Sequence, residues 1–296
     1  MKKPILFFAL IPSLLFGSCH FEKSVEKDFR NSSETISDGI GVEDVKILRN
    51  GDETPNNEFE FADDISFIFN KVTGLQEKDG KVYPKMSMRV VSSKRDTVFH
   101  EPDLLGQNLK DGTDLNPLQL TARLVPAFSI KDSPYDIYLE ITDANGKGKL
   151  EYHILIDLIE GKGLQIDAEG LGYEHIYLYN ESQKTMVREG KVDAKNEYVL
   201  MFEGLSGLQT KDGLVYPALI LDITDSLGKK VVHNPNLLQE LTDNGMKESE
   251  FLESKFPVTI RFKPYELVNP CVLKAVFEDR LSGKKIHVDG LIHIQY

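Results

Sequence analysis

An internal repeat is the feature that most restricts the folds open to this chain of 296 residues. The segment 74–84 (GLQEKDGKVYP) recurs as 207–217 (GLQTKDGLVYP), with nine of the eleven positions identical and an offset of 133 residues. Near the end of each copy the match resumes at an offset of 136, which places Asp143 on Asp279 and Lys149 on Lys285. Self-similarity over such a period predicts one structural unit that is used twice.

The repeat predicts two domains, which we place at residues 43–160 and 172–296, joined through a segment that contains several glycines. The two offsets, 133 and 136, differ by an amount that a surface loop absorbs. At about 120 residues each, both copies are long enough to bury a hydrophobic core without disulfides.

Apolar residues alternate with polar ones within each copy, as at Met86, Met88 and Val90. A period of two is typical of a strand with one buried face. The pair Asn145-Gly146 lies between two such runs and is a strong hairpin signal. We therefore predict an all-β chain of two tandem antiparallel β-sandwiches, immunoglobulin-like and derived from an internal duplication.

One short helix is expected in a loop of each sandwich. In the first copy, Asn116 and Pro117 are a good N-cap and first-turn pair ahead of Leu118, Leu120 and Leu124. In the second copy, residues 247–255 have helix-forming composition. The brevity of both segments favours a role in covering the sandwich over one in recognition.

The first residues of the chain indicate export. Lys2 and Lys3 precede an apolar run that ends at Phe16, and small residues follow it. A basic start, an apolar centre and a small-residue cleavage site are typical of a secretory signal peptide. The run is well short of the about 20 residues that span a bilayer. We assign residues 1–18 to a signal peptide and the polar segment 19–42 to a flexible tether.

The sequence Leu15-Phe16-Gly17-Ser18-Cys19 resembles the lipobox of bacterial lipoproteins, in the looser form found in Bacteroidota. With the domain order, it makes the chain similar to Bacteroidota-type outer-membrane lipoproteins of unknown function with tandem immunoglobulin-like domains. The resemblance implies cleavage before Cys19, lipid on that residue and attachment to the outer membrane, on either the periplasmic or the surface face. The alternative is an ordinary signal peptide cut near Ser18, with Cys19 incidental.

The repeated motif supplies two candidate ligand loops. The side chains that they offer are Gln76, Lys78, Asp79 and Tyr83 in the first copy, and Gln209, Lys211, Asp212 and Tyr216 in the second. A structural interpretation is favoured, because Asp-Gly supplies a turn that needs positive φ and Tyr-Pro opens the next strand. Two copies of one fold share the residues that determine packing.

Other polar groups are interpreted as structural. His100 and His233 recur at the repeat offset but lack the further ligands that a zinc site needs. The segment after Asp143 is a hairpin turn rather than a calcium loop. Asp63 and Asp64 are expected to be a solvated pair at a strand start. No cofactor or metal is expected.

Catalysis finds no support in the motifs of the sequence. It has no Gly-x-Ser-x-Gly elbow and no His-Glu-x-x-His. Cys271 lies in an apolar run at the position of Tyr135 in the first copy, so we expect a buried strand residue without a disulfide.

The leading hypothesis is a non-enzymatic, lipid-anchored envelope protein that acts as a binding, adhesion or structural module. Its partners are the membrane, through lipid on Cys19, and an envelope protein or glycan. The net charge of −12 argues against nucleic acid. The alternatives are a surface carbohydrate-binding lipoprotein, which the absence of Trp disfavours, a fimbrial subunit or anchor, and a hydrolase.

Overall fold

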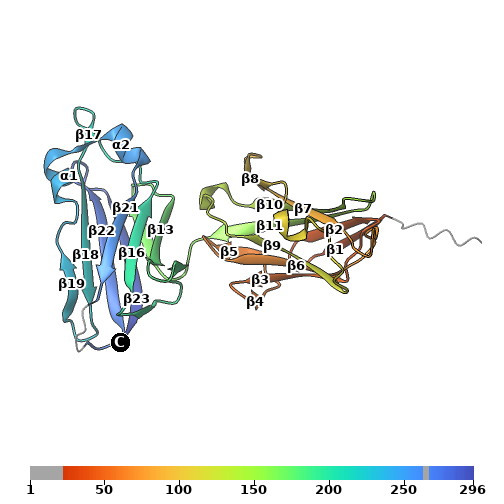
Figure 1. The fold of residues 1–296 in the computed structure, drawn as a ribbon. Helices are drawn as coiled ribbons and strands as arrows, with labels where there is room; N and C mark the ends of the chain where they lie inside the picture. The colour runs from red at the N-terminus through yellow and green to blue at the C-terminus, as the bar shows by residue number, and fades with distance from the viewer. Residues whose placement is uncertain (1–22, 263–266) are drawn as a thin grey trace, which may run out of the picture.

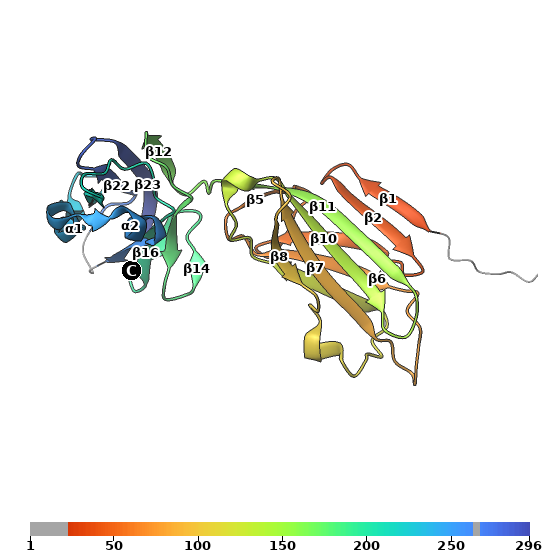
Figure 2. The ribbon, with the colours of Figure 1, turned by 90° about the horizontal axis from the view of Figure 1, so that it is seen from above.

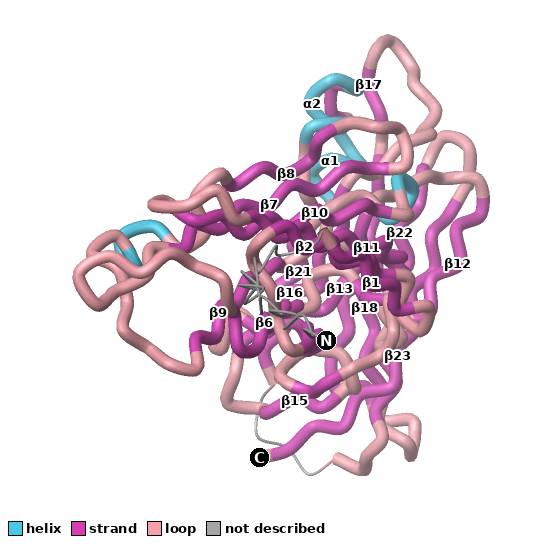
Figure 3. Tube along the Cα trace, turned by 90° about the vertical axis from the view of Figure 1, so that its right-hand side faces the viewer, coloured by secondary structure: helices cyan, strands magenta, loops and turns pink. Residues whose placement is uncertain are grey.

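The protein is described by a computed structural model that covers residues 23–262 and 267–296. The predicted all-β fold is confirmed, because strands make up most of these residues and the helical turns are short and lie in loops (Figure 3). The strands form two β-sandwiches, and one end of the first faces the side of the second, so that their strands run in different directions (Figures 1 and 2). We call them the N-terminal sandwich, up to residue 160, and the C-terminal sandwich, from residue 164.

The N-terminal sandwich consists of a large and a small sheet. The large sheet has the order β1-β2-β11-β10-β7-β8, with β5 parallel to β11, and the small sheet has the order β4-β3-β6-β9. The strands are β1 (Ser24–Asp28), β2 (Ser33–Asp38), β3 (Asp44–Arg49), β4 (Asp52–Glu53), β5 (Glu58–Glu60), β6 (Ile65–Val72), β7 (Pro84–Ser92), β8 (Thr97–Glu101), β9 (Leu118–Leu124), β10 (Tyr135–Asp143) and β11 (Lys149–Ile159).

The C-terminal sandwich has the same two-layer plan. Its large sheet has the order β12-β23-β22-β18-β19, with β15 parallel to β23, and its small sheet has the order β14-β13-β16-β21. The strands are β12 (Gln165–Glu169), β13 (His175–Asn180), β14 (Thr185–Met186), β15 (Lys191–Asp193), β16 (Glu197–Glu203), β18 (Pro217–Thr224), β19 (Lys230–Asn234), β21 (Phe256–Arg261), β22 (Cys271–Asp279) and β23 (Lys285–Gln295). A two-stranded ribbon joins β17 (Leu214–Val215) to β20 (Met246–Lys247).

The two sandwiches share one strand topology. The path β2-β11-β10-β7-β8 corresponds to β12-β23-β22-β18-β19, and β3-β6-β9 corresponds to β13-β16-β21. The outer strands β8 and β19 even carry a β-bulge at the same place, where each pairs with its neighbour. This agreement is expected of a repeated unit, whereas the immunoglobulin-like relationship and the origin by duplication stay predictions.

Alternating burial gives each sandwich its own hydrophobic core, as the period of two predicts. In β7 and β10 every second side chain is buried between the sheets, among them Met88 and Ile137. Cys271 is fully buried at the start of β22, as predicted, and Tyr135 takes the corresponding position in β10. Burial raises the pKa of the Cys271 thiol.

The predicted boundaries of the two domains need correction. The segment assigned to a tether includes β1 and β2, which pair with each other and, through β2, with β11. Ile40 is fully buried in the N-terminal core. The C-terminal sandwich likewise begins before residue 172, because β12 pairs with β23 and Leu164 packs on its core. A polar edge strand is held by backbone hydrogen bonds, so its composition resembles that of a tether.

The prediction of a helix after Asn116 is wrong. Residues 118–124 form β9, in which Leu118, Leu120, Ala122 and Leu124 point into the core. The leucines were spaced two and four apart, a pattern that a strand satisfies better than a helix. The N-terminal sandwich has 3₁₀ turns instead, at Gly106–Leu109 and Ile130–Asp132. In the second copy α2 (Glu248–Glu253) confirms the expected helix, and α1 (Gln239–Asn244) precedes it.

The predicted signal peptide and Cys19 lie outside the described residues. Within the described ranges, no helix combines the length and the apolar character needed to cross a membrane.

Candidate functional site

The two copies of the repeated motif are held in the same way, each on its own sandwich. The Gln76 backbone N–H donates to Asp143 Oδ2 at 2.5 Å, and the Gln209 N–H donates to Asp279 Oδ2 at 2.8 Å. Both aspartates are buried at the ends of β10 and β22. The Asp143 Oδ1 also accepts from the Asn145 N–H at 3.0 Å, which makes this hairpin an Asx turn.

The turns inside the motif also match between the copies. Asp79 and Asp212 both have φ of 54° and the glycines that follow them have φ of 76°. Tyr83 packs on Gly112, where an added Cβ would lie 2.8 Å from the ring. Tyr216 packs on Gly245 in the same way, with an added Cβ at 3.0 Å. These contacts are those of the structural interpretation, and the ligand-loop hypothesis stays a prediction.

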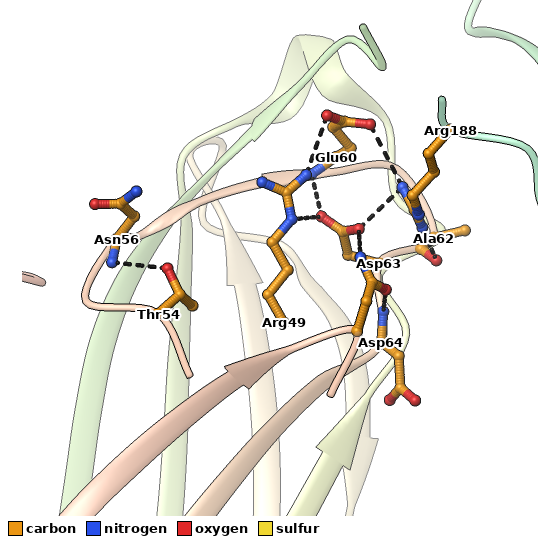
Figure 4. Close-up of polar contacts among 9 residues, drawn as sticks. Arg49, Thr54, Asn56, Glu60, Ala62, Asp63, Asp64 and Arg188 are labelled. Atoms are coloured by element: carbon orange, nitrogen blue, oxygen red, sulfur yellow. Dashed lines mark hydrogen bonds and ion pairs between the residues drawn. The ribbon is translucent and has the colours of Figure 1, made fainter. Parts of the chain in front are cut away.

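The strongest polar cluster joins the two sandwiches, and sequence analysis did not single it out. We call Arg49, Glu60, Asp63 and Arg188 the arginine–carboxylate cluster (Figure 4). Asp63 is fully buried, so the expected solvated pair is wrong for this residue. Its carboxylate accepts from Arg49 Nε at 2.7 Å and lies 2.9 Å from Arg188 NH1. Asp64 alone behaves as expected, paired at the surface with Arg123 at 2.6 Å.

Arg188 comes from the C-terminal sandwich, just after β14, and its partners belong to the N-terminal sandwich. Besides Asp63, it lies 3.4 Å from Glu60 Oε2 and donates to the Ala62 carbonyl at 2.7 Å (Figure 4). Glu60 is also 3.1 Å from Arg49 NH2. Two guanidinium groups thus neutralise two carboxylates, which is the condition under which buried charges are tolerated.

Aromatic contacts extend the joint beside this cluster. Phe61 stacks on His175 with ring centroids 3.9 Å apart and lies 5.3 Å from Tyr177. His175 is only 7% exposed, its Nδ1 has no hydrogen-bond partner, and burial lowers its pKa. Around the linker, the Lys131 ammonium donates to the Tyr173 carbonyl at 2.6 Å. The joint therefore packs a neutral imidazole against a phenyl ring.

The joint encloses little free space. Its cavity, of about 50 Å³, lies among Phe61, Leu164, Tyr173 and His175. Small-molecule sites usually occupy about 300–1,000 Å³, so this cavity is too small for a typical substrate. Glu60, at the edge of this cavity, and Asp63 are both bound by guanidinium groups.

Metal chemistry has no evident place in the described ranges, where no three His, Cys, Asp or Glu side chains are grouped to hold an ion. The two recurring histidines lie on edge strands. His233 Nδ1 is 2.6 Å from Asp222 Oδ1, and His100 lies opposite Arg89.

The arrangement of the joint is suited to holding two domains in one orientation.

No family model matches the chain, and no curated protein matches it. Among solved structures, pT26-6p is 7% identical, with a TM-score of 0.27, over 92% of this chain and 65% of that one. The chain thus covers less than two thirds of pT26-6p. The three FKBP domains of wheat FKBP73 are 7% identical, with a TM-score of 0.11, over 78% of this chain and 95% of that one. Neither likeness bears on fold or function.

Proposed function

We propose that the protein is a non-enzymatic, lipid-anchored envelope protein whose two sandwiches act as one rigid binding, adhesion or structural module. The observation that carries this proposal is the arginine–carboxylate cluster, in which Arg188 of one sandwich is bound by Glu60, Asp63 and the Ala62 carbonyl of the other. A second attachment beside the covalent linker removes the rotation that a single linker would allow. A rigid joint keeps the C-terminal sandwich at a fixed distance and orientation from the N-terminal one, as a protein that presents or spaces a partner requires.

The placement of the first described residues agrees with an N-terminal anchor. β1 begins at the end of the N-terminal sandwich that is remote from the C-terminal sandwich (Figures 1 and 2). A lipid on Cys19 would therefore hold the C-terminal sandwich away from the membrane. The anchor and the outer-membrane location rest on the lipobox resemblance.

The anchor is tested by labelling cells that express the full chain with a fatty-acid analogue. We expect label on the wild type and none on Cys19→Ala, and we expect the wild type in the outer-membrane fraction. Label that persists on Cys19→Ala would refute lipidation at that residue. Recovery of the unlabelled wild type in the soluble fraction would refute the envelope anchor.

Two of the alternative functions, the fimbrial role and carbohydrate binding, are each favoured by one observation. For a fimbrial role it is β1, an edge strand paired with β2 whose side chains are mostly exposed, because strand exchange needs a displaceable edge. Purified protein that stays monomeric after removal of β1 by proteolysis would contradict that role. For carbohydrate binding it is the row of Arg89, Tyr138 and His153, which lies on the outer face of the large sheet of the N-terminal sandwich.

A further inference from the structure

One row of outward-facing side chains, exposed or half-buried, crosses the large sheet of the N-terminal sandwich. The cross-strand row consists of His100 on β8, Arg89 on β7, Tyr138 on β10, His153 on β11 and Glu34 on β2, each directly opposite the next in the strand register. Residues in such register on one face of a sheet lie close enough for their side chains to interact. The row thus brings an arginine, a tyrosine and two histidines together on this face.

The centre of the row is a stack of three groups. The Arg89 Cζ lies 4.5 Å from the centroid of the Tyr138 ring, and the His153 ring stacks on Tyr138 at 4.7 Å with an interplanar angle of 19°. Because β10 lies between β7 and β11, Arg89 and His153 approach Tyr138 from its two sides. His153 is fixed in turn by Asp136, whose Oδ1 is 2.6 Å from Nε2. The stack presents ring edges and N–H groups to solvent.

Arg89 is held in place without a carboxylate. Its interaction is the contact with Tyr138, and within the described ranges no acidic side chain lies at ion-pair distance from its guanidinium. A guanidinium stacked on an aromatic ring keeps its N–H fork free and pre-oriented for a bidentate acceptor.

The corresponding row of the C-terminal sandwich is built differently. It runs from His233 through Asp222 and Lys274 to Asp289, with the same pairing of strands. Here each polar side chain has a partner within the row. Asp222 Oδ1 lies 2.6 Å from His233 Nδ1, and Lys274 Nζ lies 3.8 Å from Asp289 Oδ1. One scaffold thus carries a closed row of ion pairs in one copy and a row with a free guanidinium in the other. The shared fold does not require the second arrangement, so this row is where the two copies differ in the chemistry that they offer.

The row lines an open groove of about 510 Å³, within the range of small-ligand sites. Besides Arg89 and the histidines, the groove is lined by Glu34, Glu140 and Glu151. Lys149 binds both of the last two, at 2.7 Å from Glu140 and 2.5 Å from Glu151. The groove therefore offers one cluster of donors and one of acceptors.

We propose that this groove binds a short sugar acid, whose carboxylate is taken by Arg89 and whose hydroxyls donate to the groove glutamates. The site deepens the binding role proposed above and rests on it. A sugar acid carries both the acceptor and the donors that the groove requires. An acidic peptide has the carboxylate but lacks the hydroxyls, so it would leave Glu140 and Glu151 without the donors that a sugar supplies.

The same geometry limits the ligand further. Both sides of the Tyr138 ring are occupied, so a neutral sugar finds no free aromatic face to stack on. The net charge of −12 opposes a long polyanion. The groove therefore selects one or two acidic rings, bound at their edges.

The test is a titration of the purified full chain, followed by NMR or calorimetry, with the disaccharide digalacturonate as the probe. We expect binding to the wild type and at least about tenfold weaker binding to Arg89→Ala, because the charge-assisted hydrogen bonds to the carboxylate are lost. Arg89→Lys should also bind more weakly, because an ammonium cannot make the bidentate contact of a guanidinium. Lys274→Ala, at the position of Tyr138 in the other sandwich, is the matched control and should bind as the wild type does. Galactose, inorganic phosphate and the dipeptide Glu-Glu should each bind at least about tenfold more weakly.

Several results would overturn the proposal. These are the absence of digalacturonate binding to the wild type, binding to Arg89→Ala within twofold of the wild type, and equal binding of galactose, phosphate or Glu-Glu. Loss of binding in Lys274→Ala would also overturn it. Because the titration does not depend on the lipid or on the location of the protein, its failure is distinct from a failure of the lipid-anchor test.

Discussion

Removal of the Arg188 side chain should uncouple the two sandwiches. In Arg188→Ala, Asp63 loses a partner at 2.9 Å, Glu60 loses one at 3.4 Å, and the Ala62 carbonyl loses a donor at 2.7 Å. A hydrogen bond to a charged group contributes about 1.5–3 kcal/mol, and breaking a buried ion pair costs about 3–5 kcal/mol. Arg188 is 24% exposed and Arg49 stays beside both carboxylates, so the loss should be smaller than for a fully buried pair. We therefore expect Arg188→Ala to lower the free energy of unfolding by about 2–3 kcal/mol.

The surface offers a matched control for this substitution. Arg123 makes a two-point contact with Asp64, but its side chain is 66% exposed and its partner 39%. Exposed pairs contribute about 0–1 kcal/mol, so Arg123→Ala should be nearly neutral.

The measurement combines urea unfolding, followed by far-UV circular dichroism, with small-angle X-ray scattering. We expect Arg188→Ala to lower the free energy of unfolding of the less stable sandwich and to broaden the distribution of interatomic distances. Equal free-energy losses in Arg188→Ala and Arg123→Ala, together with unchanged scattering, would refute the role assigned to the joint.

Three further predictions concern the joint and the repeated loops. Burial lowers the pKa of His175, so the unfolded state binds the proton more readily than the folded state. Stability should therefore fall as the pH drops below about 6.5, and His175→Phe should lose this dependence. If the melting temperatures of both proteins change in parallel between pH 5 and pH 8, the prediction is contradicted. Asp279→Ala should cost about 1–3 kcal/mol in urea unfolding, because the Gln209 N–H loses its acceptor, the fully buried carboxylate of Asp279. A loss below about 0.5 kcal/mol would count against that anchor. Gly112→Ala should destabilise the protein by about 1–3 kcal/mol more than Gly80→Ala. Both glycines have positive φ, but an added Cβ at Gly112 meets the Tyr83 ring, whereas one at Gly80 meets nothing within 4 Å. Equal melting temperatures of the two variants would argue against this packing.

The fold was predictable where the side chains carry the pattern. Met86, Met88 and Val90 alternate because β7 has one face in the core, and the turn after Asp79 needs a residue that tolerates positive φ. β1 was missed because its side chains are mostly exposed on both faces and it is held by backbone pairing, which the residue types do not reveal.

The joint was beyond the reach of sequence reasoning. Arg188 and Glu60 are separated by 128 residues, and neither belongs to the repeated motif. Asp63 was interpreted as solvated because acidic residues are rarely buried unless they are paired, and its partner Arg188 comes from the other sandwich. The row of Arg89, Tyr138 and His153 is likewise formed by three strands, so it becomes visible only once their register is known.

The bulges in β8 and β19 decide where a foreign strand can join the molecule. A bulge interrupts the regular ladder of N–H and C=O groups and twists the edge, which protects an exposed edge strand against pairing with another chain. The opposite edge of the N-terminal large sheet, β1, pairs with β2 in one continuous register. Self-association or capture of an extended peptide by this sheet should therefore begin at β1, on the side from which the chain enters.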